Sequence, residues 1–161
     1  MAIRNAAKAI IIKDGKIFLN KYQVEEGNIY YELPGGGQLQ YETMEEAVIR
    51  ECLEETGYCV KVLRFAAIVE EMFDDEERRK SYPDYVHRIH HIFQVELTDE
   101  PRVVQSEPDK NQVDNVWISI DDVANLRLIP RPLRQNLKEI LTSQNPVYLG
   151  VVHEYNLKSI H

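Results

Sequence analysis

The segment Gly35–Tyr58 decides the fold and reads GGGQLQYETMEEAVIRECLEETGY. It begins with three glycines, passes through a short polar turn and continues with helical periodicity. Thr43 and Glu46 form the T-x-x-E pattern of a capping box, which predicts a helix that starts near Met44. Gly57 is expected to end this helix, because glycine adopts the left-handed backbone conformation at low cost.

The predicted helix has one apolar face and an acidic C-terminal half. Three- and four-residue spacing gives one apolar stripe, formed by Met44, Ala47, Val48 and Cys52. Glu51 and Glu55 lie roughly 40° apart around the axis, with Glu54 roughly 60° to the other side of Glu51. These like charges repel each other near the end of the helix where the dipole also opposes them. A divalent cation would relieve both penalties, and carboxylate oxygens suit Mg²⁺ or Mn²⁺. The alternative is a solvated acidic face with Arg50 as its local partner.

The glycine loop and the spacing of the fixed residues decide between these interpretations. Gly36 is followed by five residues, Glu42, seven residues and then Arg50–Tyr58, which reads RECLEETGY. This pattern resembles the Nudix box, G-x5-E-x7-R-E-U-x-E-E-x-G-U, where U is an aliphatic residue. Every fixed position matches, and the departures are Cys52 and Tyr58 at the two U positions. Both side chains can pack as apolar groups, so neither threatens the chemistry.

The resemblance implies a role for each residue of the box. The implied metal ligands are the Gly36 carbonyl and the carboxylates of Glu51, Glu54 and Glu55. Glu54 is the expected catalytic base, with Glu55 as the alternative, and Arg50 would orient the acids through charge-assisted hydrogen bonds. The expected cofactor is therefore Mg²⁺ or Mn²⁺.

The predicted reaction is hydrolysis of a nucleoside diphosphate linked to another moiety, X, giving a nucleoside monophosphate and phosphorylated X. The negative oxygens of a diphosphate repel a nucleophile, so a catalyst must neutralise them and deliver a water in line. The chain has no downstream proline of the kind that marks the ADP-ribose group of this family, and no coenzyme A signature. Oxidised nucleoside triphosphates, other nucleotides, nucleotide sugars and capped RNA ends stay open as substrates.

Two other functions are compatible with a Nudix-like chain. One is a non-catalytic nucleotide sensor or regulatory module. Such domains usually show a degraded Nudix box, whereas this sequence has every acid of the box. The other is an isomerase or a housecleaning enzyme of loose specificity that uses the same acids. Metal-dependent release of a monophosphate would separate hydrolysis from both binding and isomerisation.

The fold implied by the resemblance is α/β, with a mixed β-sheet sandwiched between α-helices. Periodicity alone supports one α/β or α+β domain, and 161 residues suffice for one core. The Nudix domain is expected over residues 1–145, and residues 146–161 are expected to be a C-terminal extension that forms a tail, a strand or a homodimer arm. Strands are expected at 6–12, 17–22, 29–33, 59–71, 86–97 and 113–118, with a final helix at 133–141.

Several residues outside the box are candidates for ligand contact. The run Asp74–Ser81 is expected to be a solvated hairpin tip, and the alternative is a mobile flap whose Arg78, Arg79 and Lys80 meet a phosphate. Arg4 and His90 are the candidate substrate-binding residues, with Arg88 on the same strand face as His90. His91 falls on the apolar face and is expected to be a core histidine. The candidates for a further metal ligand are Glu107, Asp109 and Asp114.

Composition limits the class of partner and the compartment. The net charge of −8 argues against a long nucleic acid as the main partner and leaves a small nucleotide as the expected ligand. No apolar run is long enough to span a bilayer, and no signal-peptide pattern is visible, so no membrane partner is expected. Cys52 and Cys59 show neither metal-type pairing nor a disulfide framework. A cytoplasmic location is the expectation that follows.

Overall fold

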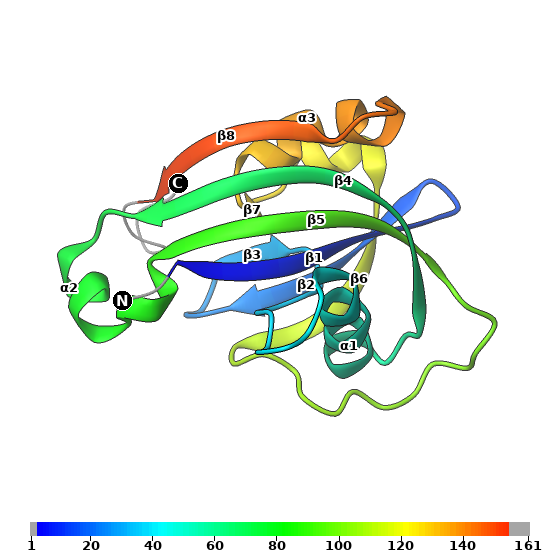
Figure 1. Ribbon diagram of the computed structural model, residues 1–161, viewed down its shortest axis with the longest axis horizontal. Helices are drawn as coiled ribbons and strands as arrows, with labels where there is room; N and C mark the ends of the chain where they lie inside the picture. The colour runs from blue at the N-terminus through cyan, green and yellow to red at the C-terminus, as the bar shows by residue number, and fades with distance from the viewer. Residues whose placement is uncertain (1–2, 155–161) are drawn as a thin grey trace.

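The computed structural model describes residues 3–154, which form a strongly curved mixed sheet (Figure 1). The strand order is β7-β3-β2-β1-β5-β4-β8, and β6 pairs with β2. The strands in this part of the chain are β1 (Arg4–Lys13), β2 (Lys16–Gln23), β3 (Ile29–Glu32), β4 (Val60–Phe73), β5 (His87–Leu97), β6 (Gln112–Ser119), β7 (Leu128–Ile129) and β8 (Val147–Glu154).

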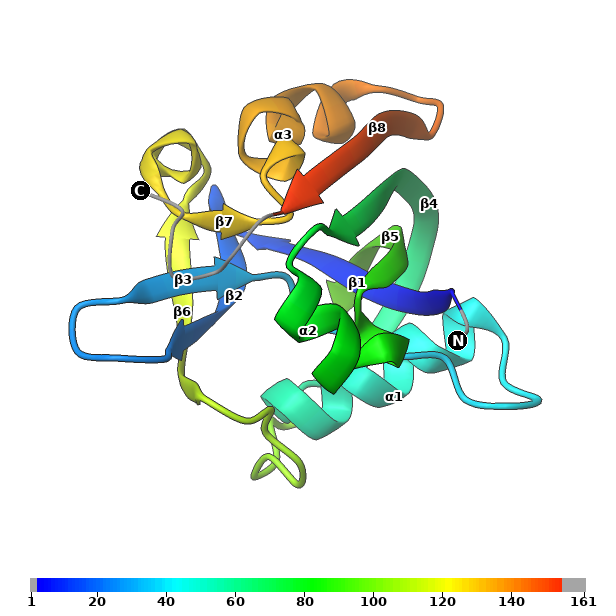
Figure 2. The same cartoon turned by 90° about the vertical axis from the view of Figure 1, so that its left-hand side faces the viewer.

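Helices cover both sides of this sheet. They are α1 (Met44–Thr56), α2 (Glu76–Ser81) and α3 (Pro132–Thr142), with the 3₁₀ segments η1 (Pro83–Tyr85) and η2 (Ile120–Asn125). Figures 1 and 2 place α1 and α3 on opposite sides of the sheet, which confirms the expected α/β fold with a sheet between helices. Among residues 3–154, no helix has the length and apolar character needed to cross a membrane.

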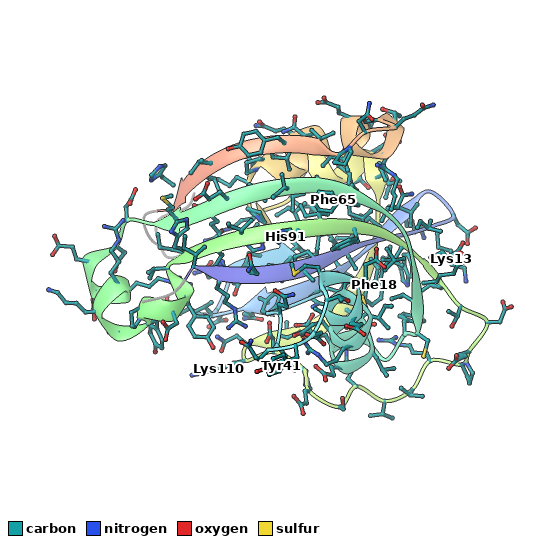
Figure 3. All side chains as sticks on the ribbon, in the orientation of Figure 1. Lys13, Phe18, Tyr41, Phe65, His91 and Lys110 are labelled. Carbon is teal, nitrogen blue, oxygen red and sulfur yellow. The ribbon has the colours of Figure 1, made fainter. Side chains whose placement is uncertain are left out.

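The alternation of side chains along β1 divides the core between these two sides. Ala7, Ala9 and Ile11 pack with α1, whereas Ile10 packs in the cluster that contains α3 residues. On the α1 side, Phe18 (labelled in Figure 3) makes edge-to-face contacts with the rings of Tyr58, just after α1, and Trp117 of β6. Both faces of β1 are thus buried, and the strand is a fixed platform for the cavity described below.

The helix α1 has the predicted ends because both are set by local chemistry. Thr43 Oγ1 accepts a hydrogen bond from the Glu46 amide, and the Thr43 amide donates to the Glu46 carboxylate at 2.8 Å. Gly57 follows the helix with φ of 74°, and a side chain there would also collide with the Val103 carbonyl. The capping box and the glycine stop are therefore confirmed.

Strand pairing brings distant charged residues into one row. β1 and β2 form the predicted hairpin, with Asp14 and Gly15 in the left-handed conformation at its turn. β1 pairs in parallel with β5, which places Arg4 opposite Arg88, and β5 pairs with β4, which places Arg88 opposite Glu71. The three side chains belong to neighbouring strands at the same level of the sheet.

The structure adds detail to two expected segments, the charged run 74–81 and the C-terminal segment. The charged run lies in the connection of the β4–β5 hairpin, and most of its side chains are exposed, as expected, but Glu76–Ser81 is helical and forms α2. Asp75 caps it by accepting from the Arg78 amide at 2.7 Å, and its acids precede its bases, as the helix dipole favours. In the C-terminal segment, Val147–Glu154 is the parallel outer strand β8 beside β4. Residues 155–161 lie outside the described part of the chain.

Candidate active site

A cavity of about 970 Å³ lies beside the glycine loop 35–37. Its walls come from β1, β2, β3, the α2–η1 segment, the start of β5 and the loop before β6, which carries Lys110 (labelled in Figure 3). Glu51 is the acid of α1 that lines it. The charged lining residues are Arg4, Lys8, Glu32, Glu51, Asp75, Glu77, Arg78, Arg88, Asp109 and Lys110.

Arg50 holds the acids of α1 and the preceding loop together. Its guanidinium donates to both Glu42 oxygens, at 2.7 and 3.0 Å, and to the Gly37 carbonyl at 3.0 Å. It also donates to Glu51 at 2.8 Å and to Glu54 at 3.0 Å. One planar cation therefore holds two carboxylates of the helix relative to the glycine loop.

Glu55 is the buried member of the acid cluster. Its side chain accepts hydrogen bonds from Asn20 Nδ2 and from the Gly35 amide, both at 2.8 Å. Burial raises the pKa of Glu55 to about 8, although the nearby Lys8 ammonium opposes that shift. A carboxylate whose charge is disfavoured by burial gains from a bound cation, so this environment suits a metal ligand.

Glu51 packs directly against the backbone of Gly36. A Cβ atom at Gly36 would lie 2.6 Å from the Glu51 carboxylate, so glycine alone permits this approach. Burial raises the pKa of Glu51 against the effect of Arg50. The Gly36 carbonyl accepts from the Ala7 amide at 2.8 Å, so a cation would have to use its second lone pair.

The carboxylates of Glu51, Glu54 and Glu55 and the Gly36 carbonyl are hard oxygen ligands next to the glycine loop. Their chemistry therefore fits Mg²⁺ or Mn²⁺. Within residues 3–154, no three acidic, histidine or cysteine side chains already converge as a metal centre. Glu51 and Glu54 instead each direct one oxygen at Arg50. The second oxygen of each carboxylate is therefore the one that could bind a cation without loss of the bond to Arg50.

Lys8 is a buried cation beneath the glycine loop. Its ammonium donates to the Gly35 carbonyl at 2.5 Å, and to the Leu33 carbonyl and Glu32 Oε2 at 3.3 Å each. The pKa of Lys8 is raised, because Glu32 and Glu55 outweigh the burial that disfavours its charge. Lys8 thus holds the start of the glycine loop through its hydrogen bonds to the Leu33 and Gly35 carbonyls.

The candidate residues outside the box occupy different places. Arg4 lies in the cavity wall, against Gly37 and over the Tyr85 ring at 4.6 Å. His90 is 1% exposed and contacts Glu71 at 3.1 Å beneath the wall, so it is not part of the lining. Its strand neighbour Arg88 does line the cavity. His91 is half-buried on the other face and packs near Phe65, with 6.2 Å between ring centroids (Figure 3).

The three candidates for a further metal ligand, Glu107, Asp109 and Asp114, lie in different places. Asp109 lines the cavity and accepts a 3.1 Å hydrogen bond from the Tyr22 hydroxyl. Asp114 is exposed on β6, and the backbone amide of Glu107 donates to the Glu54 carbonyl at 3.3 Å. Of the three candidates, Asp109 is therefore the one in the cavity wall.

The sequence pattern did not identify Lys8 or Asn20. Lys8 is the single polar residue in the apolar run AAKAIII, and Asn20 directly follows the apolar run IFL and precedes Lys21. A polar residue in or beside a buried run is the signal that could have found them, because a buried polar side chain needs a partner.

Comparisons with known proteins point to one domain family. The NUDIX domain model matches residues 3–141. An ADP-ribose pyrophosphatase of Methanocaldococcus jannaschii is 47% identical over 57 residues, which are 35% of this chain and only 34% of that relative. The nucleoside triphosphatase NudI of Klebsiella pneumoniae is 29% identical over 134 residues, covering 80% of this chain and 90% of the relative.

Solved structures share the fold at low sequence identity. A NUDIX hydrolase from Nitrosomonas europaea superposes with a TM-score of 0.70 at 17% identity, covering 99% of this chain and 97% of that one. A UDP-X diphosphatase superposes with a TM-score of 0.67 at 21% identity, covering 94% of this chain and 68% of that one.

Proposed function

This chain belongs to the NUDIX domain family and is a Nudix-type pyrophosphohydrolase, and from that premise we propose a metal-dependent reaction on a small nucleotide. The substrate is a nucleoside diphosphate linked to a moiety X, and the products are a nucleoside monophosphate and phosphorylated X. The arrangement that carries the proposal is the Arg50 cluster, which holds Glu51 and Glu54 against the glycine loop at the cavity.

The metal ligands in this proposal are the carboxylates of Glu51, Glu54 and Glu55, together with the Gly36 carbonyl. When bound there, Mg²⁺ or Mn²⁺ neutralises the diphosphate oxygens and lowers the pKa of water. Glu55 is held by Asn20 and Gly35, so its position is fixed before any ligand arrives.

Proton transfer is assigned to Glu54. Its side chain is 27% exposed, against 14% for Glu51, and Arg50 supplies a hydrogen bond to one of its oxygens. In the proposed step, the Glu54 carboxylate takes a proton from water while the water oxygen forms a bond to phosphorus. The P–O bond to the bridging oxygen breaks, and the leaving phosphate carries away that electron pair. Glu55 is the alternative base.

The relatives suggest which substrates to test first. Their names include ADP-ribose, nucleoside triphosphates and UDP linked to X. The test is a Mg²⁺-dependent hydrolysis screen over these classes in ¹⁸O-labelled water, with the products identified by mass. The proposal expects a monophosphate product, one ¹⁸O per cleavage, and loss of turnover in Glu54→Gln.

The exposed Glu45 at the start of α1 provides a matched control. Glu45→Gln removes one carboxylate from the same helix at a position remote from the acid cluster, and it should retain wild-type turnover. Tight nucleotide binding by a folded protein without turnover of any class would instead support the sensor function.

A further inference from the structure

Three arginines line the cavity, and strand pairing places two of them side by side. Arg4 of β1 lies opposite Arg88 of β5, at a spacing of about 4.8 Å between neighbouring strands. Arg78 reaches the same region from α2. Arg78 and Arg88 both contact the Phe73 ring, with guanidinium carbons 3.7 and 5.3 Å from its centroid.

The positive charge of this row is only partly compensated. Arg88 forms an ion pair with Glu71, a buried carboxylate that also contacts His90. Among residues 3–154, neither Arg4 nor Arg78 has a carboxylate within ion-pair distance, and each guanidinium lies over an aromatic ring instead. The Nε of Arg88 is buried and has no hydrogen-bond partner in the described structure. The row therefore offers unused donors to a ligand, and its three guanidiniums have one paired carboxylate, Glu71. Glu32, Asp75 and Glu77 also line the cavity but form no ion pair with these arginines in the described structure.

The row begins at the proposed site of hydrolysis and leads away from it. A side chain at Gly37 would collide with the Arg4 guanidinium, so Arg4 directly adjoins the glycine loop. Arg88 lies one strand farther, and Arg78 of α2 meets it at the Phe73 ring in the same cavity wall. Figure 2 shows α2 at this end of the sheet. A ligand whose diphosphate lies at the glycine loop can thus extend along the arginines.

We propose that Arg4, Arg88 and Arg78 form a second anion subsite, which binds a phosphate or carboxylate that the substrate carries beyond its scissile diphosphate. The substrate class is then a nucleoside triphosphate or a nucleoside diphosphate linked to an anionic X, in preference to a neutral sugar. This inference rests on the proposed hydrolase function and narrows its substrate.

The neighbouring residues of α2 separate this role from general surface charge. Arg79 donates to the Phe73 carbonyl at 2.7 Å and pairs with Asp74, so its guanidinium is already used. Lys80 is exposed and does not line the cavity. Arg78→Gln tests the subsite, and Lys80→Gln is the matched control that removes the same charge from the same helix.

The experiment compares kcat/KM within pairs of substrates that differ by one anionic group. The pairs are UDP-glucuronate with UDP-glucose for a carboxylate, ADP-ribose 1″-phosphate with ADP-ribose for a phosphate on X, and dGTP with dGDP for a terminal phosphate. Wild type should favour the charged member of at least one pair. Arg78→Gln should reduce that preference about ten- to a hundredfold, because a charge-assisted hydrogen bond is lost. Arg78→Lys should restore part of it, and Lys80→Gln should leave it unchanged.

Other outcomes overturn the subsite. Equal kcat/KM for both members of every pair, or a preference that survives in Arg78→Gln, contradicts it even if hydrolysis is confirmed. If no pair is hydrolysed, the hydrolase proposal fails separately, and the dissociation constants of the same pairs are compared for wild type and Arg78→Gln. An unchanged ratio of dissociation constants then contradicts the subsite as well. Circular dichroism confirms that each variant is folded.

Discussion

Replacement of Arg50 by methionine tests whether one side chain holds the acid cluster. The change removes donors from Glu42, Glu51 and Glu54 and leaves their charges facing one another. Deleting one partner of a buried ion pair costs about 3–5 kcal/mol, whereas an exposed pair is worth about 0.2–1 kcal/mol. The Arg50 side chain is 25% exposed and its two closest partners are 13% and 14% exposed. We therefore expect the free energy of unfolding to fall by about 2–4 kcal/mol.

Magnesium should recover part of this loss. A divalent cation at the acids supplies the positive charge that Arg50 no longer provides, and it stabilises the folded state by mass action. The assay is urea unfolding of wild type and Arg50→Met, with and without Mg²⁺. Lys61→Met is the control, because Lys61 and Glu96 form an exposed pair at 3.4 Å whose side chains are 72% and 50% exposed. A loss in Arg50→Met no larger than in Lys61→Met would refute the structural role of Arg50.

Three further predictions concern the glycine loop, a buried carboxylate and the support of Glu55. Gly35→Ala should cost about 2 kcal/mol or more in urea unfolding, because φ is 128° and the new Cβ would collide with backbone atoms of β1. Gly27→Ala, with φ of 77° and open space around it, should cost only about 1 kcal/mol, and equal losses would contradict the packing argument. Burial would raise the pKa of Glu71, but the Arg88 guanidinium and His90 hold it near 2, below its unfolded value of about 4.3. Its ionised form therefore stabilises the fold above about pH 4.5, and this contribution is lost as the pH falls towards 2. Glu71→Gln should be less stable at neutral pH and should show a flatter stability profile across that window, so an unchanged profile would contradict the shift. Asn20→Leu removes a donor to Glu55 and should weaken Mg²⁺ binding about 10- to 100-fold in calorimetry, whereas unchanged affinity would show that this hydrogen bond does not position the ligand.

The elements that sequence predicted well are those fixed by neighbouring residues. The ends of α1 depend on Thr43, Glu46 and Gly57, which lie within or next to the helix. The turn of the hairpin between β1 and β2 is formed by the adjacent residues Asp14 and Gly15. Helical spacing likewise places Arg50 within reach of Glu51 and Glu54, whereas Glu55 bonds to Asn20 and Gly35 instead.

The residues that sequence missed acquire their roles from long-range pairing. Lys8 contacts the glycine loop 27 residues later, and Asn20 reaches Glu55 35 residues later. His90 was expected on a ligand-facing surface, but the neighbouring strand β4 buries it against Glu71. The alternation of a strand identifies which residues share a face, but it does not show what covers that face.

The most direct test of the proposed mechanism is the rate of nucleoside monophosphate formation as a function of Mg²⁺ concentration, measured for wild type and Glu54→Gln. The proposal predicts a rate that saturates with Mg²⁺ in wild type and falls by about 10²–10⁴ in the variant, because both metal binding and proton transfer are impaired. A rate that is independent of the metal, or that Glu54→Gln leaves unchanged, would contradict the assignment of catalysis to the acids of α1.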